Sequence, residues 1–170
     1  MRTTAAAAGS SLFFAAAPGV VAGVVPWALT RWQARDLPAG LFPLRLVSAA
    51  LVVAAVGVLV HAFARFVMEG RGTPAPVAPT DVLVVGGLYR HVRNPMYVAV
   101  VAGVVGQALA LAQPVLAAYA VALGATFAAF VRGYEEPVLS RRYGQRYDDY
   151  RRAVPAWLPR LRPWQPPEQT

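Results

Sequence analysis

The stretch that decides the fold is NPMYVAVVAGVVGQALALAQPVLAAYAVALGATFAAFV, residues 94–131, which holds thirty-eight residues without a charged side chain. As one helix it would measure about 57 Å at ~1.5 Å per residue, nearly twice the ~30 Å hydrocarbon core of a bilayer. The chain must therefore fold back on itself. Gln113-Pro114 lies near the middle, and proline suits the first turn of a new helix. We predict a tight helical hairpin with spans over residues 95–112 and 114–132.

The composition of the whole chain also indicates a bilayer as its solvent. Of the 170 residues, 57% are hydrophobic and only 14% are charged, whereas a soluble domain has about 25% charged residues. The chain has no cysteine, which excludes disulfides, thiolate metal sites and cysteine nucleophiles. Its two histidines, His61 and His91, cannot build a metal centre unaided, so no metal is expected.

Two further apolar runs predict spans over residues 11–30 and 46–68. The first run has a rival interpretation as a cleaved signal peptide, because Arg2 and an apolar stretch precede three alanines at residues 15–17. The run continues well past those alanines, which favours a retained anchor. We therefore predict one all-α integral membrane domain over residues 1–170 with about four transmembrane helices. A loop over 69–94 and a tail over 133–170 lie on one side.

The arginines predict which side that is. All sixteen basic residues are arginine, and thirteen of them lie in the N-terminus, the loop and the tail. The opposite side carries three, namely Arg31, Arg35 and Arg45. The positive-inside rule then places the loop and the tail in the cytoplasm, and we expect a bacterial inner-membrane protein. This placement explains the net charge of +8 without nucleic acid, since basic segments beside a membrane meet anionic headgroups.

The predicted hairpin places Arg93 at the same end as the adjacent carboxylates Glu135 and Glu136, where the last span meets water. Beyond Pro137, one apolar and three tyrosine residues recur at spacings of four, four and three, namely Leu139, Tyr143, Tyr147 and Tyr150. This periodicity predicts an amphipathic C-terminal helix. Such a helix can lie on the membrane surface, and we expect the aromatic tail to roof a cleft between these charges. The pattern alone leaves two hypotheses open: a ligand site between these charges, or interfacial salt bridges that only anchor the helices.

An ordered set of motifs in the C-terminal half resembles the isoprenylcysteine carboxyl methyltransferase-like family, whose wider circle includes phospholipid N-methyltransferases. The motifs are Gly87-Leu88-Tyr89, Arg93-Asn94-Pro95-Met96-Tyr97, Glu135-Glu136-x-x-Leu139, Tyr143-Gly144-x-x-Tyr147-x-x-Tyr150 and Val154-Pro155. The resemblance runs from about Val82 to Pro159, close to half the chain. The first two predicted spans share only their apolar composition with that family and carry none of its motifs.

The resemblance implies S-adenosylmethionine as methyl donor, bound without a Rossmann domain. It implies Arg93 and Glu135 as catalytic residues and Arg132 as a substrate-binding residue. The cofactor-binding positions carried over from the family are Leu83, Val84, Tyr89, Asn94, Pro95, Tyr97, Glu135 and Glu136. Asn94 departs from the family's usual Arg-His-Pro, and it keeps hydrogen-bonding capacity but cannot act as a titrating base. Arg132 lies three residues before Glu135, where the family arginine would lie about four before.

The expected methyl acceptor is an apolar or lipid-like molecule that arrives from the bilayer, with O-, N- and S-methylation all open. A membrane reductase of the sterol-reductase type, which uses NADPH, is the nearest alternative. Val98, Ala99 and Val100 stand where that class has an acidic residue, which weakens it. A small transporter or scaffold is a further alternative. Proton-coupled transporters need an intramembrane carboxylate, and none falls within a predicted span.

Overall fold

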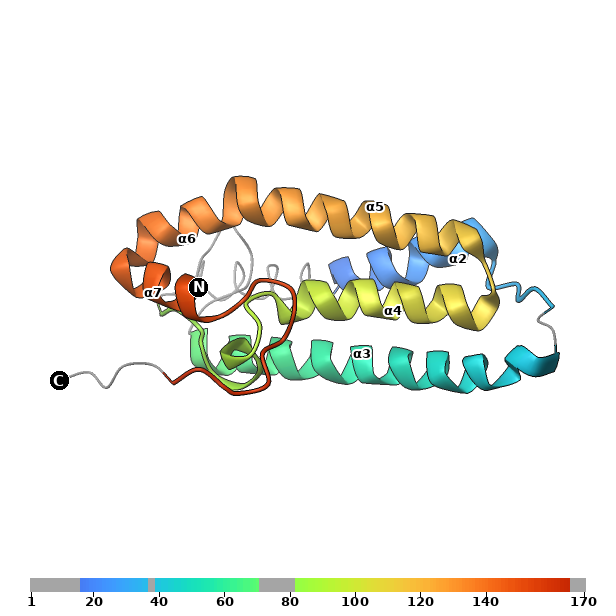
Figure 1. Cartoon of the computed structure of the whole chain (residues 1–170). Helices are drawn as coiled ribbons and strands as arrows, with labels where there is room; N and C mark the ends of the chain where they lie inside the picture. The colour runs from blue at the N-terminus through green and yellow to red at the C-terminus, as the bar shows by residue number, and fades with distance from the viewer. Residues whose placement is uncertain (1–15, 37–38, 71–81, 166–170) are drawn as a thin grey trace, which may run out of the picture.

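The computed structural model describes residues 16–36, 39–70 and 82–165, and these residues form helices and irregular segments without a strand (Figure 1). Residues 11–15 of the first predicted span, 71–81 of the predicted loop and 166–170 of the tail lie outside this description. The fold of the described chain is therefore all-helical, as its composition predicts.

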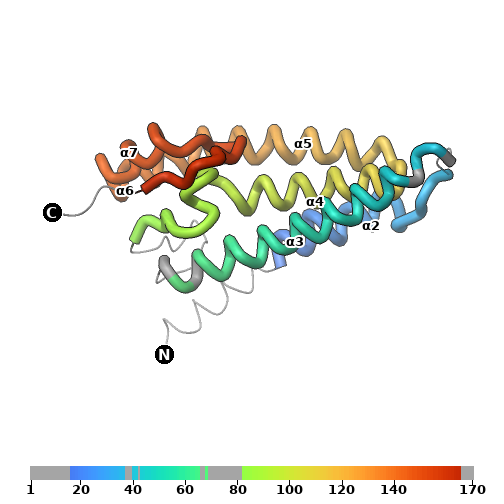
Figure 2. Tube along the Cα trace, turned by 60° about the horizontal axis from the view of Figure 1, so that its bottom comes forward, coloured from blue at the N-terminus to red at the C-terminus, as the bar shows by residue number. Residues whose placement is uncertain are grey.

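Three long helices run side by side, with a shorter fourth segment packed among them (Figures 1 and 2). The long helices are α3 (Phe42–Gly70), α4 (Pro95–Leu111) and α5 (Pro114–Phe130). The shorter segment joins a π-helix, Val20–Val24, to α2 (Val25–Thr30). Short 3-10 helices over Ala39–Leu41 and Gly87–Arg90 precede α3 and α4.

The hairpin predicted between the last two spans is present. Helix α4 ends at Leu111 and is capped by Ala112, whose backbone is left-handed with φ 50°, and Gln113 then takes an extended conformation. The Gln113 amide donates back to the Ala108 carbonyl at 3.0 Å, which satisfies one of the last free carbonyls of α4. Pro114 then lies in the first turn of α5, where its fixed φ suits a helix start.

Helices α3 and α4 approach each other closely because small residues lie between them. A side chain on Gly106 would place its Cβ 2.7 Å from the Val52 side chain, so only glycine fits there. A Cβ on Gly103 would meet that of Ala55 at 3.6 Å. Helices in a membrane associate through such contacts, since lipid gives no hydrophobic drive between them.

The first helical segment is tied to this bundle by polar side chains. Gln107 donates to the Ala22 carbonyl at 2.7 Å, and the Tyr119 hydroxyl donates to the Val21 carbonyl at 2.9 Å. Both carbonyls belong to the π-helix, whose irregular hydrogen bonding leaves room for outside donors. The segment is therefore an integral part of the described fold.

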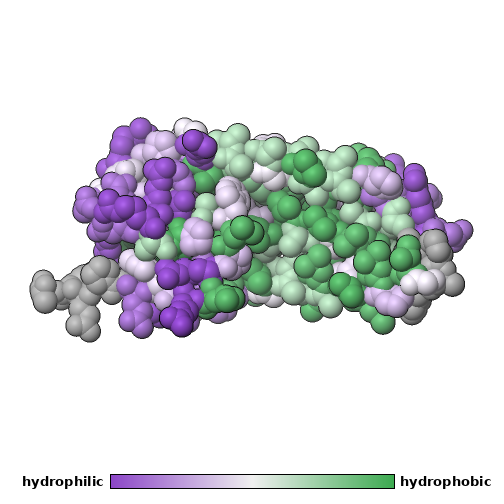
Figure 3. All heavy atoms as spheres, in the orientation of Figure 1, coloured by the Kyte–Doolittle hydropathy of each residue, from purple (hydrophilic) through white to green (hydrophobic). Residues whose placement is uncertain are grey.

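The face of the bundle seen in Figure 3 is apolar in the middle and polar at both ends. Two helical stretches, Pro43–Arg65 and Pro114–Tyr143, are long and apolar enough to cross a membrane, and only 17% of each hydrophobic window is buried in the protein. Two shorter apolar helices cover Ala16–Thr30 and Pro95–Leu111. Apolar side chains that face outward over this area need lipid as their solvent, so the protein is a membrane protein.

The C-terminal helix differs from its prediction in two ways. Helix α5 does not end near residue 132 but continues through a π-helix, Val131–Glu135, into α6 (Glu136–Tyr143). The predicted single amphipathic helix is then broken at Gly144, which separates α6 from α7 (Gln145–Ala153). Gly144 has φ 54° and ψ −135°, a conformation that residues with side chains rarely adopt, and the chain turns sharply there.

The break changes what the tyrosine-rich face does. Tyr147 and Tyr150 are buried in a cluster with Leu83 and Val154, and Leu139 and Tyr143 pack against it. The face therefore covers the protein's own chain before α4, as expected for a tail that roofs the site, and it is not turned toward the membrane surface. The physical reason is that the turn at Gly144 folds α7 back over the segment that precedes α4.

Candidate active site

The centre of the candidate site is a buried ion pair between Arg93 and Glu136. Arg93 Nη1 lies 2.6 Å from Glu136 Oε1, and the two side chains are only 11% and 9% exposed. Arg93 ends the segment before α4, while Glu136 begins α6, so the hairpin of α4 and α5 brings them together. The same Nη1 also donates to the Tyr147 hydroxyl at 3.2 Å.

Glu136 is held by a second arginine. Arg151 Nη2, from α7, lies 3.2 Å from Glu136 Oε2, so both carboxylate oxygens have cationic partners. The sequence predicted that this carboxylate lies where the last span meets water, and that prediction is wrong, because the residue is buried. A buried charge persists only when it is paired and hydrogen-bonded. Glu136 therefore orients Arg93 and, through Arg151, holds α7 beside it.

Glu135 has a different environment from its neighbour. The Tyr97 hydroxyl donates to Glu135 Oε2 at 3.1 Å, and the Tyr97 ring packs against Phe127 with centroids 4.6 Å apart. In the described part of the chain, Glu135 Oε1 has no hydrogen-bond partner. Glu135 closes the π-helix, and such irregular turns are frequent at functional sites. One carboxylate oxygen is thus left to meet a ligand.

Arg93 also keeps an unused donor. Its Nε is buried and has no hydrogen-bond partner among the described residues. Leaving a buried donor unsatisfied costs about 1–3 kcal/mol, so an acceptor from a ligand would stabilise this arrangement. The cluster therefore offers one buried N–H donor and one carboxylate oxygen. This donor set fits an amino-acid zwitterion, whose carboxylate accepts and whose ammonium donates.

Tyr147 and Tyr150 line the side of the site that α7 covers. Burial raises the pKa of the Tyr147 phenol, and the Arg93 guanidinium acts in the opposite direction. Burial also raises the pKa of Tyr150 well above its usual range. The Tyr150 hydroxyl donates to the Tyr89 carbonyl at 2.7 Å. Both phenols are therefore neutral at physiological pH. Tyr147 accepts from Arg93 and Tyr150 donates to Tyr89, and both bonds fasten α7 to the segment before α4.

The chain after α7 is fastened along the same segment. We call residues 154–164 the tail strap. Six hydrogen bonds join it to residues 90–94, three between backbone groups and three from side chains. They are Arg93 N to Pro155 O, Arg160 N to His91 O, Trp164 N to Arg90 O, Arg90 Nε to Trp164 O, His91 Nδ1 with Arg160 O, and Asn94 Nδ2 to Ala156 O. The tail strap thus holds Arg93 and Asn94 from outside.

The remaining predicted cofactor residues surround this cluster as packing groups. Leu83 is buried beside Tyr147 and Tyr150, while Val84 and Tyr89 are buried with Ala62. Pro95 is fully buried in the first turn of α4. Asn94 is buried, and its amide donates to Ala156 O at 3.2 Å. These side chains shape the site.

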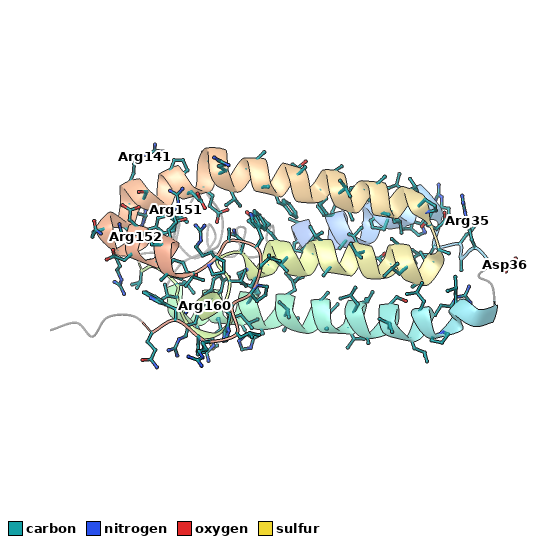
Figure 4. All side chains as sticks on the ribbon, viewed as in Figure 1. Arg35, Asp36, Arg141, Arg151, Arg152 and Arg160 are labelled. Carbon is teal, nitrogen blue, oxygen red and sulfur yellow. The ribbon has the colours of Figure 1, made fainter. Side chains whose placement is uncertain are left out.

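Arg132 is not brought into the cluster. It is exposed in the π-helix, and no hydrogen bond or ion pair joins it to another described residue. Arg93, Tyr97, Glu135 and Glu136 do come together, at the end of the bundle where Arg141, Arg151, Arg152 and Arg160 gather (Figure 4).

Sequence reasoning missed three residues that the structure adds to the site: Tyr147, Arg151 and Trp157. Tyr147 belongs to the periodic tyrosine pattern of the tail, so the signal was present, but the pattern alone did not single out Tyr147 as the partner of Arg93. Arg151 is one of eight arginines from residue 132 onward, and nothing in its spacing marks it as the partner of Glu136. Trp157 lies in the tail strap, whose position depends on backbone hydrogen bonds that leave no sequence pattern.

Two apolar cavities lie along the outer side of the α4–α5 hairpin. One, of about 440 Å³, is lined by Tyr97, Val98, Val101, Ala102, Gly124, Ala128 and Trp157. The other, of about 420 Å³, shares Val101 and Gly124 with it and continues toward Leu109 and Ala117. Tyr97 therefore lines the first cavity with its body while its hydroxyl reaches Glu135. An apolar groove from the bilayer side thus ends beside the polar cluster.

The described chain is an all-helical membrane protein with an arginine–carboxylate cluster at one end. The chain belongs to the phospholipid methyltransferase family, which matches residues 44–146. Members of this family use S-adenosylmethionine as methyl donor. The resemblance drawn from the motifs is confirmed, and the match favours a methyltransferase over the reductase and the transporter. Comparison with curated proteins and with solved structures gives no match.

Proposed function

We propose that this enzyme transfers a methyl group from S-adenosylmethionine to a membrane lipid at the cluster of Arg93, Tyr97 and Glu135. The observation that supports this proposal is that one cluster holds two groups without a hydrogen-bond partner among the described residues, the buried Arg93 Nε and Glu135 Oε1. S-adenosylmethionine carries a carboxylate, an ammonium and a methyl group that its sulfonium activates. Arg93 Nε would donate to the carboxylate, and Glu135 would accept from the ammonium.

Positioning then supplies most of the catalysis, because the methyl group is already activated. The Tyr97 ring lies between Glu135 and the apolar cavity, where a cation–π contact to the sulfonium would contribute roughly 0.5–2 kcal/mol. Glu136, Arg151 and Tyr147 act as positioning residues in this proposal. Glu136 and Tyr147 hold the Arg93 guanidinium through contacts of 2.6 and 3.2 Å. Arg151 forms a second ion pair with Glu136.

The acceptor would lie in the groove along α4 and α5. Both cavities there are lined by alanine, valine, leucine and glycine apart from Tyr97 and Trp157, which suits acyl chains. A lipid in this groove would bring its polar head to Tyr97 and its chains along α5. Arg132 is exposed at the same end of α5, and a role in binding the acceptor headgroup remains our prediction for it.

We also propose four spans, with the loop and the tail in the cytoplasm. Ala16–Thr30 and Pro95–Leu111 are shorter than the two long candidate spans, but both are packed within the bundle. The labelled charges in Figure 4 support the orientation, since four arginines gather at one end while Arg35 and Asp36 lie at the other. S-adenosylmethionine is made in the cytosol, so the site must face it. A reporter fused after the tail should be active in the cytoplasm, and periplasmic activity would overturn this topology.

The test of the proposed function uses the full chain in lipid nanodiscs. Isothermal titration should show binding of S-adenosylmethionine and of its demethylated product, with no binding of NADPH in a parallel titration. Incubation with donor labelled in the methyl group should move the label into the lipid fraction. If the protein binds S-adenosylmethionine but no label reaches any of the phospholipids supplied, a lipid acceptor is contradicted. Binding of NADPH alone would contradict the whole proposal.

A further inference from the structure

The tail strap exposes two leucines that its own hydrogen bonds do not explain. Leu158 is 80% exposed and Leu161 is 97% exposed, the highest values among the large exposed apolar side chains of the described chain. Both lie in a segment whose backbone is fixed by the bonds from Arg160 and Trp164 to residues 90 and 91. A fixed segment that holds leucines in water is unfavourable, so a partner that covers them would stabilise it.

The position of the tail strap identifies the partner as the bilayer. Trp157, the residue before Leu158, lines the apolar cavity on the outer side of α4 and α5. The strap therefore begins at the edge of the apolar belt and runs along the polar end of the bundle (Figures 1 and 3). This depth is that of lipid headgroups, where tryptophan is enriched.

The charge of the tail strap narrows the choice of lipid. Arg160 and Arg162 alternate with Leu161, and Arg162 is exposed without a polar partner among the described residues. The segment has no acidic residue between 150 and 165. We propose that the tail strap is a membrane-docking element, in which Leu158 and Leu161 insert at the level of the headgroups of an anionic bilayer while Arg162 contacts their phosphates.

Docking would also act on the active site, because the tail strap and the site share residues 90–94. Arg93 donates its backbone amide to Pro155, and Asn94 donates its side chain to Ala156. Anything that binds only the docked strap stabilises the arrangement of these residues. The strap would thus keep Arg93 in place most firmly on an anionic surface.

The test uses single cysteines, since the chain has none of its own. Leu161→Cys carries an environment-sensitive fluorophore, and Gln145→Cys, exposed at the start of α7, is the matched control. Each labelled protein is placed in nanodiscs of phosphatidylcholine alone and in nanodiscs that also contain phosphatidylglycerol. Quenching by nitroxide lipids reports insertion, and quenching by aqueous iodide reports exposure to water.

We expect the label at 161 to be quenched by nitroxide lipids and shielded from iodide, more strongly when phosphatidylglycerol is present. The label at 145 should stay open to iodide in both discs. Arg162→Gln, combined with Leu161→Cys, should weaken docking to the anionic discs about fivefold, as expected for one arginine at an anionic surface. Equal quenching in both discs, or a label at 161 that is open to iodide in both, would overturn the proposal.

A second variant tests docking without an attached fluorophore, in case the label itself inserts into the bilayer. Leu158→Ser combined with Leu161→Ser should leave the melting temperature in detergent unchanged, because both side chains are exposed. In anionic discs the same variant should show stronger iodide quenching of the native Trp157 and Trp164. Unchanged quenching of these tryptophans would contradict docking through the leucines. None of these readouts uses methyl transfer, so a failure here is distinct from a failure of the proposed function.

Discussion

Arg93 and Glu136, forty-three positions apart in the chain, form a buried ion pair with a nitrogen–oxygen distance of 2.6 Å. The pair joins the segment before α4 to the start of α6, and thereby closes the hairpin at its polar end. Glu135, its immediate neighbour, contacts Tyr97 instead. We therefore propose separate tasks for the two adjacent carboxylates: Glu136 orients the arginine, and Glu135 keeps an oxygen for a ligand.

The first prediction separates these two tasks. Glu135→Gln should lower the affinity for S-adenosylmethionine about ten- to a hundredfold, since a hydrogen bond to a charged group contributes roughly 1.5–3 kcal/mol. Its melting temperature should stay close to that of the wild type, because Tyr97 can still donate to the amide oxygen. The measurement is donor affinity beside melting temperature in the same detergent.

Glu136→Gln is the matched control. It should lower stability more than it lowers affinity for S-adenosylmethionine, the reverse of Glu135→Gln. Loss of the carboxylate leaves Arg93 and Arg151 without their shared partner, which should cost about 1–3 kcal/mol of stability. Donor affinity should fall only as far as Arg93 loses its position. If Glu135→Gln unfolds the protein while Glu136→Gln does not, the assignment of the two carboxylates is reversed.

The second prediction concerns the unused donor of Arg93. Arg93→Lys keeps the positive charge but cannot bond Glu136, Tyr147 and a ligand at once, because an ammonium lacks the planar fork of a guanidinium. We expect the affinity for S-adenosylmethionine to fall at least tenfold, since one buried charged hydrogen bond is lost. A lysine variant with normal affinity would mean that Arg93 contributes only its charge, and the role of Nε would be wrong.

The sequence predicted the hairpin and the meeting of Arg93 with the carboxylates because both follow from length and charge. Residues 94–131 are too long for one crossing, and Gln113-Pro114 marks the turn. The sequence could not predict the break at Gly144, since tyrosines at helical spacing continue through it. It also could not show that the tail strap pairs with residues 90–94, because backbone hydrogen bonds between irregular segments have no periodicity.

The third prediction tests the bond that fastens α7. Tyr150→Phe removes the donor to the Tyr89 carbonyl and should cost about 1–3 kcal/mol of stability, since a buried carbonyl loses its partner. Because burial raises the pKa of Tyr150 in the folded state, the unfolded chain ionises first, at about pH 10. This contribution to stability is fully present below that pH and declines as pH rises above it.

The measurement is the melting temperature of both proteins from neutral pH to above about pH 10. The wild type should lose stability more steeply with rising pH than Tyr150→Phe, because the variant has one buried phenol fewer. Tyr143→Phe is the control, since Tyr143 is only partly buried beside the cluster. Parallel curves for wild type and Tyr150→Phe would show that Tyr150 titrates like an exposed tyrosine, contrary to its burial.

The last prediction concerns Asn94, which stands where the resembling family has histidine. Its amide donates to Ala156 O at 3.2 Å and so ties the tail strap to the start of α4. Asn94→Ala should lower stability by about 1–3 kcal/mol, because the partly buried Ala156 carbonyl loses its donor. Asn94→His should recover most of that loss, since a neutral imidazole also carries one N–H donor.

The comparison also decides what the position does in the reaction. If residue 94 only fastens the strap, Asn94→His should restore donor affinity and leave the pH dependence of methyl transfer as in the wild type. If a base is needed there, the histidine variant should instead gain activity with an inflection near pH 6.5, the ordinary pKa of histidine. Initial rates of methyl transfer across this pH range, with the acceptor saturating, distinguish the two. We expect the first result, because the wild type carries at this position an amide that donates to the Ala156 carbonyl and cannot act as a titrating base.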